Sequence, residues 1–285
     1  MKKIKKIALL PNVITAFGLS CGLFVIFRMN MIERGEVDLQ ALLQVTGILL
    51  LAAFSDLLDG AVARAIKAQS EFGGTFDTLA DAISFGVAPS IIVLKSLAIV
   101  PGTSFSFLIT AAAMVYSLSG VLRLVRFQVH SLVGKEDSEQ AREQMKYFTG
   151  LPIPAAAAAI VSLNLFLFSN EYFLFSLAHS HQVLLLSFAL VLIGYCMISQ
   201  WKFPSVKTLE IQVASFQTLF LTVIAAALIF YGILHHFALI FLVLSWGYIF
   251  IAFIFSLLRF FSRQRGGRLE EVEVDLEEES STSEE

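Results

Sequence analysis

Residues 55–84 read SDLLDGAVARAIKAQSEFGGTFDTLADAIS, and they place four aspartates and one arginine between two strongly apolar segments. Charged side chains within membrane-spanning segments are costly, so they usually mark a functional site. Asp56 and Asp59 are three residues apart, and Asp77 and Asp81 are four residues apart. Side chains at these spacings lie on one face of a helix. The stretch therefore predicts two helices that each present a pair of carboxylates.

The sequence around this stretch has the composition of an integral membrane protein. Of its 285 residues, 57% are hydrophobic, and the mean hydropathy is +0.78. Each of its long apolar runs is close to the ~20 residues that a helix needs to cross a bilayer. We predict an all-α integral membrane protein with eight transmembrane helices, at roughly residues 12–28, 40–65, 75–99, 104–127, 150–169, 182–200, 215–234 and 238–260. The aspartate stretch then joins the second helix to the third.

The basic residues predict how the chain is oriented in the membrane. Seventeen of the 20 Lys and Arg residues fall on one side of the predicted spans, Arg28 and Arg34 fall on the other, and Lys95 lies within a span. Loops rich in Lys and Arg stay in the cytoplasm. We therefore predict a multi-pass protein of the inner (cytoplasmic) membrane with both termini and the four aspartates at the cytoplasmic side.

Four carboxylates that face one another in a membrane protein need neutralisation by shared protons or by a bound cation. Ligand sets made only of oxygen favour Mg²⁺, Mn²⁺ or Ca²⁺ over zinc or copper. Arg64 could clamp a phosphate, and glycines nearby allow a ligand to approach the backbone. The residues thus indicate metal-assisted chemistry on a phosphate or diphosphate. A divalent-cation transporter is an alternative, although its charges would more often lie near the middle of the membrane.

The pattern Asp56-x2-Asp59-Gly60-x2-Ala63-Arg64-x8-Gly73-x3-Asp77-x3-Asp81 resembles the full signature of the CDP-alcohol phosphatidyltransferase family. Four further stretches resemble the bacterial, membrane-integral phosphatidylserine synthase group of that family: DAISFGVAPS (81–90), LRLVRFQV (122–129), FTGLPIPAAAA (148–158) and WKFPSVK (201–207). The resemblance implies transfer of a phosphatidyl group from CDP-diacylglycerol to L-serine, with CMP as the second product. Glycerol 3-phosphate, inositol, an inositol phosphate and choline remain alternative acceptors. It also implies a six-helix core that dimerises in the membrane.

The same resemblance assigns roles to residues of this chain. It implies that two divalent ions, Mg²⁺ or Mn²⁺, are held by the four aspartates Asp56, Asp59, Asp77 and Asp81, and that Asp81 is also the general base. It places the CDP-diacylglycerol site at Asn12, Thr15, Gly60, Arg64, Ser70 and Gly73. For the acceptor or a lipid phosphate, we expect Arg123, Arg126 and Lys146. Simpler interpretations remain open: helix capping for Asn12 and Thr15, an ordinary loop serine for Ser70, and anchoring at the cytoplasmic surface for Arg123 and Arg126.

The chain is expected to have four parts. Residues 1–10 form a basic interfacial segment, residues 11–210 the phosphatidyltransferase core, and residues 211–262 two additional transmembrane helices. Residues 263–285 form an acidic tail, which its composition predicts to be disordered.

Overall fold

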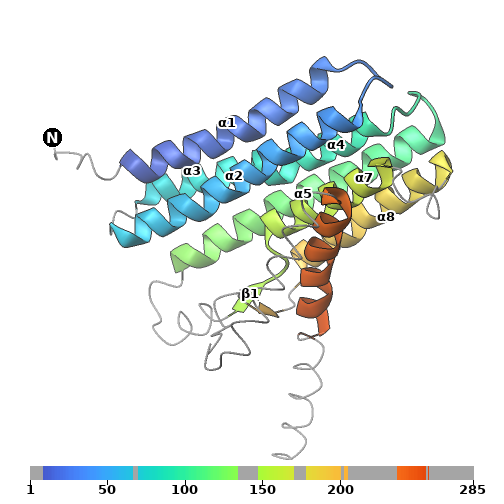
Figure 1. Cartoon of the computed structure of the whole chain (residues 1–285). Helices are drawn as coiled ribbons and strands as arrows, with labels where there is room; N and C mark the ends of the chain where they lie inside the picture. Colours follow the sequence, from blue (N-terminus) through green and yellow to red (C-terminus); the bar gives the residue numbers. More distant parts are fainter. Residues whose placement is uncertain are drawn as a thin grey trace, which may run out of the picture.

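The computed structural model describes residues 9–66, 70–133, 147–169, 178–199, 202–204, 236–254 and 256. In chain order its elements are α1 (Leu9–Met31), α2 (Leu39–Ala65), α3 (Glu71–Asp81), the π-helix η2 (Ala82–Val87), α4 (Ala88–Ser96), α5 (Ser104–Val133), β1 (Tyr147–Thr149), α7 (Ile153–Ser169), α8 (His179–Ile198) and β2 (Lys202–Pro204). A further C-terminal helix, Phe237–Ile254, follows them. Figure 1 shows α1, α2, α5 and α8 as long rods that run roughly along one direction.

The prediction of an all-α membrane protein is confirmed. Within the described ranges, six helices are long and apolar enough to cross a bilayer, and one of them is the continuous run Phe72–Ser96 formed by α3, η2 and α4. The shorter α7 is also apolar. Seven of the eight predicted spans therefore correspond to helices. The span predicted at 215–234, residues 1–8 of the predicted interfacial segment and the acidic tail lie outside the described residues.

The connection between α5 and α7 differs from the prediction. A polar loop was expected from residue 128, but α5 continues to Val133, and Tyr147–Thr149 pairs antiparallel with Lys202–Pro204. Three-residue strands show no alternation that a sequence pattern could reveal. The pairing joins the start of the 148–158 stretch to the 201–207 stretch, which are about 50 residues apart.

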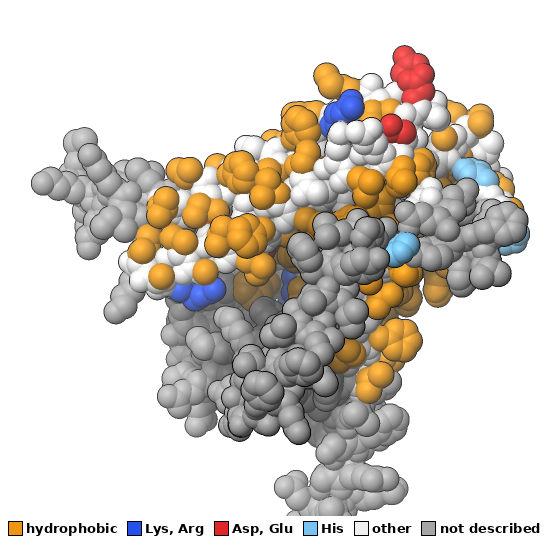
Figure 2. Space-filling model, viewed as in Figure 1, with side chains coloured by type: hydrophobic (Ala, Val, Ile, Leu, Met, Phe, Trp, Pro, Cys, Tyr) orange, Lys and Arg blue, Asp and Glu red, His pale blue; other side chains and the backbone are white. Residues whose placement is uncertain are grey.

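Contact with membrane lipid explains why many large apolar side chains lie on the outside of the helix bundle. Large apolar side chains such as Phe17, Phe107 and Phe188 are exposed. Figure 2 shows hydrophobic side chains over the flanks of the described helices, with charged side chains mainly near the ends. Inside the bundle, small residues allow helices to approach closely. A Cβ added to Gly22 of α1 would collide with Ser84 of η2. Helix α1 is therefore seated directly against the π-helix that follows Asp81.

The π-helix begins directly after Asp81, and a residue of another helix hydrogen-bonds to its backbone. Tyr116 of α5 is fully buried, and its hydroxyl donates a 2.9 Å hydrogen bond to the Phe85 carbonyl oxygen. Single π-turns occur mostly within α-helices and often near functional sites. The sequence did not predict this turn, because the residues that pair with its carbonyl groups lie on another helix.

The C-terminal helix packs on α7 through polar contacts. Trp246 Nε1 donates to the Ala159 carbonyl oxygen at 3.0 Å, and the Ser245 and Ser162 hydroxyls share a 2.7 Å hydrogen bond. In Figure 1 this orange-red helix crosses α7 and α8 at a steep angle. The two hydrogen bonds hold it in a defined register against the bundle.

Candidate active site

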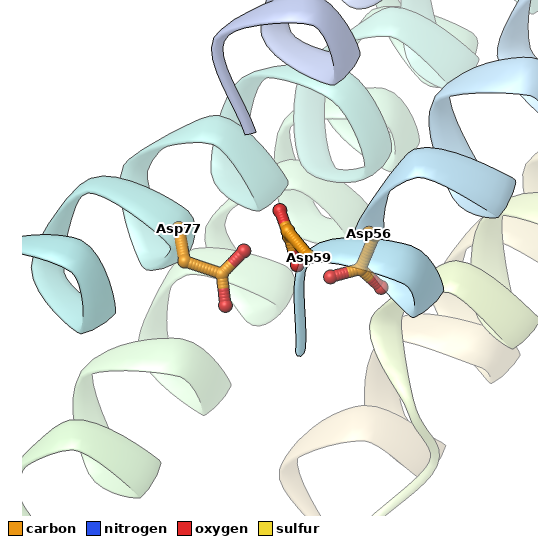
Figure 3. A group of neighbouring side chains, drawn as sticks. All are labelled: Asp56, Asp59 and Asp77. Atoms are coloured by element: carbon orange, nitrogen blue, oxygen red, sulfur yellow. The ribbon is translucent and has the colours of Figure 1, made fainter. Parts of the chain in front are cut away.

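Three of the four aspartates form one compact cluster. Asp56 and Asp59 lie near the end of α2, and Asp77 lies on α3. Each offers a carboxylate oxygen, and these oxygens lie within 4.8 Å of one another; Figure 3 shows the three side chains converging. Asp77 Oδ1 is buried without a hydrogen-bond partner in the described part of the chain. An oxygen-only cluster with an unpaired buried oxygen fits a hard divalent cation.

Asp81 lies apart from this group but lines the same narrow cavity. It is the last residue of α3 and shares the cavity with the other three aspartates, Thr15 and Ser84. The cavity volume is about 10 Å³, close to the space needed for one water molecule. The interior of the site therefore has room for an ion.

Thr15 of α1 holds one carboxylate of the cluster in place. Its buried Oγ1 lies 2.6 Å from Asp59 Oδ2 and 3.1 Å from the Pro11 carbonyl oxygen. A hydroxyl has one proton to donate, and we assign it to the shorter contact, because a bond to a carboxylate is the stronger of the two. The capping interpretation for Asn12 and Thr15 is wrong, because α1 already includes Leu9 and both residues lie inside the helix.

The first turn of α3 brings together three predicted CDP-diacylglycerol residues. Ser70 is the N-cap of α3, and its hydroxyl accepts a 3.0 Å hydrogen bond from the Gly73 backbone N–H. A Cβ on Gly73 would lie 3.0 Å from Asn12 Oδ1 and 3.0 Å from Ser70 Oγ. Gly73 therefore permits the close approach of α1 to α3. Ser70 is a capping residue, and the interpretation of an ordinary loop serine is wrong.

Gly60 and Arg64 form a pair on the surface of α2, close to the cluster. The exposed Arg64 guanidinium lies over Gly60, with Nη1 3.4 Å from the position that a Cβ would take. A methyl group at residue 60 would be in van der Waals contact with this cation. The arrangement places an exposed positive charge about one helical turn after Gly60.

Of the three residues predicted for the acceptor or a lipid phosphate, Arg126 lies against the end of α8. Arg126 Nη1 donates a 2.8 Å hydrogen bond to the Ile198 carbonyl oxygen, and the Leu151 N–H donates to the Cys196 carbonyl oxygen at 3.1 Å. Both bonds satisfy carbonyl groups at the end of α8, where a cation is also favourable. Lys146 lies outside the described residues.

Arg123 has a different environment. Its side chain is only 8% exposed, and its Nε has no hydrogen-bond partner in the described part of the chain. Its electrostatic neighbours include Asp81 and Tyr248 of the C-terminal helix. A buried guanidinium beside a carboxylate cluster is costly to maintain without a function.

Gln128 is a site-supporting residue that the sequence reasoning missed. Gln128 Nε2 donates to Thr75 Oγ1 at 3.4 Å, and Gln128 Oε1 lies 3.3 Å from Thr78 Oγ1. The Thr78 proton has a shorter contact, 2.8 Å, with the Gly74 carbonyl oxygen. The contacts of Gln128 join α5 to the turns of α3 on either side of Asp77. Thr75 and Thr78, which flank Asp77 on α3, were the available signal, but their partner is some 50 positions away.

Comparison with known proteins agrees with this geometry. The CDP-alcohol phosphatidyltransferase profile matches residues 8–201. The chain belongs to the CDP-alcohol phosphatidyltransferase family. The matched range ends before the C-terminal helix, so that helix is an addition to the matched region of this family member.

Curated relatives in this family carry two names. The chain is similar to a CDP-diacylglycerol–serine O-phosphatidyltransferase of Helicobacter pylori, with 33% identity over 73% of this chain and 76% of the relative. A protein of the same name from Bacillus subtilis is 29% identical over 70% of this chain and 91% of the relative. An archaetidylserine synthase of Methanothermobacter thermautotrophicus is 31% identical over 72% of this chain and 73% of the relative.

Proposed function

We propose that this membrane enzyme transfers the phosphatidyl group of CDP-diacylglycerol to the hydroxyl of L-serine and releases CMP. The observation that carries the proposal is the cluster of Asp56, Asp59 and Asp77, whose carboxylate oxygens lie within 4.8 Å of one another. Membership of the family supports the reaction class. The names of relatives from three distant organisms support serine as the acceptor.

The acidic cluster is suited to divalent ions. Asp56, Asp59 and Asp77 would hold the first ion, and Asp81 would complete a second site with Asp56. Bound Mg²⁺ or Mn²⁺ supplies positive charge that offsets the charge of the diphosphate and of the departing CMP. Thr15 keeps Asp59 oriented through its 2.6 Å hydrogen bond, so the ligand geometry is set before the substrate arrives.

CDP-diacylglycerol is recognised at the surface of this cluster. Arg64 pairs with the diphosphate, and Gly60 leaves space for the nucleotide beside α2. Asn12 and Gly73 lie at the first turn of α3, where free N–H groups and the helix dipole favour an anion. Ser70 contributes by ordering that turn.

Asp81 is the proposed general base. As the serine hydroxyl oxygen forms its bond to the phosphorus that carries diacylglycerol, the hydroxyl proton passes to the Asp81 carboxylate. The bond from that phosphorus to the CMP oxygen breaks, and CMP leaves with the electron pair. A carboxylate is a weak base for an alcohol, so the proton moves as attack proceeds rather than before it.

Arg123 is the proposed partner of the serine carboxylate. Its guanidinium is buried next to Asp81, and a guanidinium binds a carboxylate through two parallel hydrogen bonds. Serine held there would place its hydroxyl near the proposed base. We propose a structural role for Arg126 in place of contact with serine, because its guanidinium donates a hydrogen bond to the end of α8.

CMP release by the purified full-length protein tests the proposal. CDP-diacylglycerol and Mg²⁺ or Mn²⁺ are supplied with L-serine, glycerol 3-phosphate, inositol, inositol phosphate or choline in separate reactions. We expect chelator-sensitive CMP release with L-serine. Release with another alcohol in its place would overturn serine as the acceptor, and a folded protein that releases no CMP with any alcohol would overturn the enzyme assignment.

Orientation and assembly are further parts of the proposal. The excess of Lys and Arg on one side supports cytoplasmic termini and a cytoplasmic active site. The family resemblance supports a homodimer, surrounded by membrane lipid. Mass measurement of the detergent-solubilised protein tests the dimer, which a monomer at all concentrations would contradict.

A further inference from the structure

The bundle has a second polar cavity at the end opposite the aspartates. Its volume is about 230 Å³, and its lining includes Asn30, Arg34 and Lys95 together with apolar side chains of α4 and α5. On α1, Asn30 is 15 residues from Thr15, which corresponds to about 22 Å along a helix. This cavity is therefore separate from the proposed active site.

Lys95 is an unusual residue in this position. It lies in the last turn of α4, within the apolar run Phe72–Ser96. Its Nζ donates to the Asn30 and Ile32 carbonyl oxygens, both at 3.4 Å. These two long bonds to the end of α1 use two of the three protons of the ammonium. Capping the end of α1 therefore leaves one proton of the Lys95 ammonium available for another acceptor.

Arg34 adds a second positive charge to the same cavity. Across the described ranges, neither Arg34 nor Lys95 forms an ion pair with a carboxylate, and Figure 2 shows a few charged side chains near this end of the helices. By sequence, only Arg28, Arg34 and Lys95 are absent from the predicted cytoplasmic side. Two of these three cations line one cavity, although the non-cytoplasmic side is otherwise nearly free of Lys and Arg.

Other walls of the cavity are apolar, as contact with the glycerol backbone and acyl chains of a phospholipid requires. Ile91 and Leu94 of α4 and Ile109 of α5 supply apolar surface beside the cations. A phospholipid combines a negatively charged phosphate with an apolar glycerol backbone and acyl chains. Basic pockets between transmembrane helices bind such head groups, and an arginine can hold a phosphate through two hydrogen bonds.

We propose that this cavity binds the phosphate of an anionic membrane phospholipid, with Arg34 and Lys95 as its cationic contacts. The bound molecule belongs to the leaflet opposite the active site. The site is independent of the transfer reaction, so it goes beyond the proposed function and does not depend on it.

Lipid binding by the full-length protein tests this site. Native mass spectrometry would count phosphatidylglycerol molecules bound to the wild type, Arg34→Gln, Lys95→Met and Arg28→Gln. Arg28→Gln is the matched control, because Arg28 is exposed near the end of α1 and does not line the cavity. We expect Arg34→Gln to weaken binding roughly fivefold and Lys95→Met at least as much, while Arg28→Gln binds like the wild type.

Two results would overturn the site. One is equal phosphatidylglycerol binding by the wild type and Arg34→Gln, a variant that changes an exposed side chain and should fold. The other is equally tight binding of inorganic phosphate, which would identify a soluble anion as the ligand. CMP release by Arg34→Gln should stay at the wild-type level, so a failure of this proposal is distinguishable from a failure of the proposed function.

Discussion

At the scale of single residues, the hydroxyl of Thr15 connects α1 to the acidic cluster 44 positions further along the chain. Thr15→Val keeps the branched shape and removes the donor. Partners that orient metal-binding groups typically contribute ten- to a hundredfold to affinity. We expect Thr15→Val to need roughly tenfold more divalent ion for half-maximal CMP release.

A metal titration of CMP release checks this expectation, with Thr15→Ser as the rescue variant. Serine restores the hydroxyl and should recover most of the metal affinity. A wild-type metal requirement in Thr15→Val would show that Asp59 does not need this partner.

Asp81 is proposed to be both a ligand of the second ion and the general base, and saturating divalent ion isolates the second role. Asp81→Asn removes the proton acceptor and keeps the size of the side chain. Loss of general-base catalysis lowers rates by about 10²–10⁴-fold, so CMP release should fall within that range while CDP-diacylglycerol still binds. Glu33→Gln, at an exposed acid in the loop after α1, is the control. CMP release at the wild-type rate by Asp81→Asn would show that another residue is the general base.

The two arginines of the LRLVRFQV stretch should give different phenotypes. Arg123→Met removes the proposed partner of the serine carboxylate and should raise the KM for serine roughly tenfold or more. A tenfold change corresponds to a loss of about 1.4 kcal/mol of binding free energy. Arg126→Met removes the bond to the Ile198 carbonyl oxygen and should cost about 1–2 kcal/mol of stability, with little change in KM. Serine titrations and thermal unfolding of both variants check the assignment, and a reversed pattern would exchange the two roles.

At the scale of helices, Gly22 controls how closely α1 approaches η2. A Cβ at residue 22 would collide with the side chain and backbone of Ser84, so α1 would have to move. We expect Gly22→Ala to lower the free energy of unfolding by about 1–3 kcal/mol. Since α1 also carries Thr15, the apparent metal affinity should fall as well.

Gly47→Ala is the matched control for this prediction. Gly47 lies on α2, and a Cβ there would meet no atom within 4 Å. Alanine favours a helix more than glycine does, so this variant should be as stable as the wild type or more so. Thermal unfolding of both variants in the same detergent gives the comparison, and equal stability would mean that α1 is not closely packed on η2.

Much of the helix arrangement could be predicted, because long apolar runs and isolated charges are local signals. Asp56, Asp59 and Asp77 stood out because a carboxylate in an apolar run is rare. The contacts that complete the site could not be predicted in the same way. The partners of Thr15, Gln128 and Arg126 all lie on other helices, and periodicity along one segment carries no information about them.

At the scale of the whole molecule, orientation in the membrane can be measured directly. After removal of the native Cys21 and Cys196, a Pro101→Cys variant should react with an impermeant maleimide added to intact cells. Pro101 is exposed in the loop between α4 and α5, on the predicted outer side. A cysteine at Ser70, beside the proposed active site, should react only after lysis. The opposite labelling pattern would reverse the predicted topology.

The C-terminal helix extends the site beyond the region that family members share. It packs on α7 through Ser245 and Trp246, and it places Tyr248 among the electrostatic neighbours of Arg123. Yet it lies outside the matched residues 8–201. The surroundings of Arg123 thus include a helix outside the matched range, whereas all four aspartates of the signature lie within it.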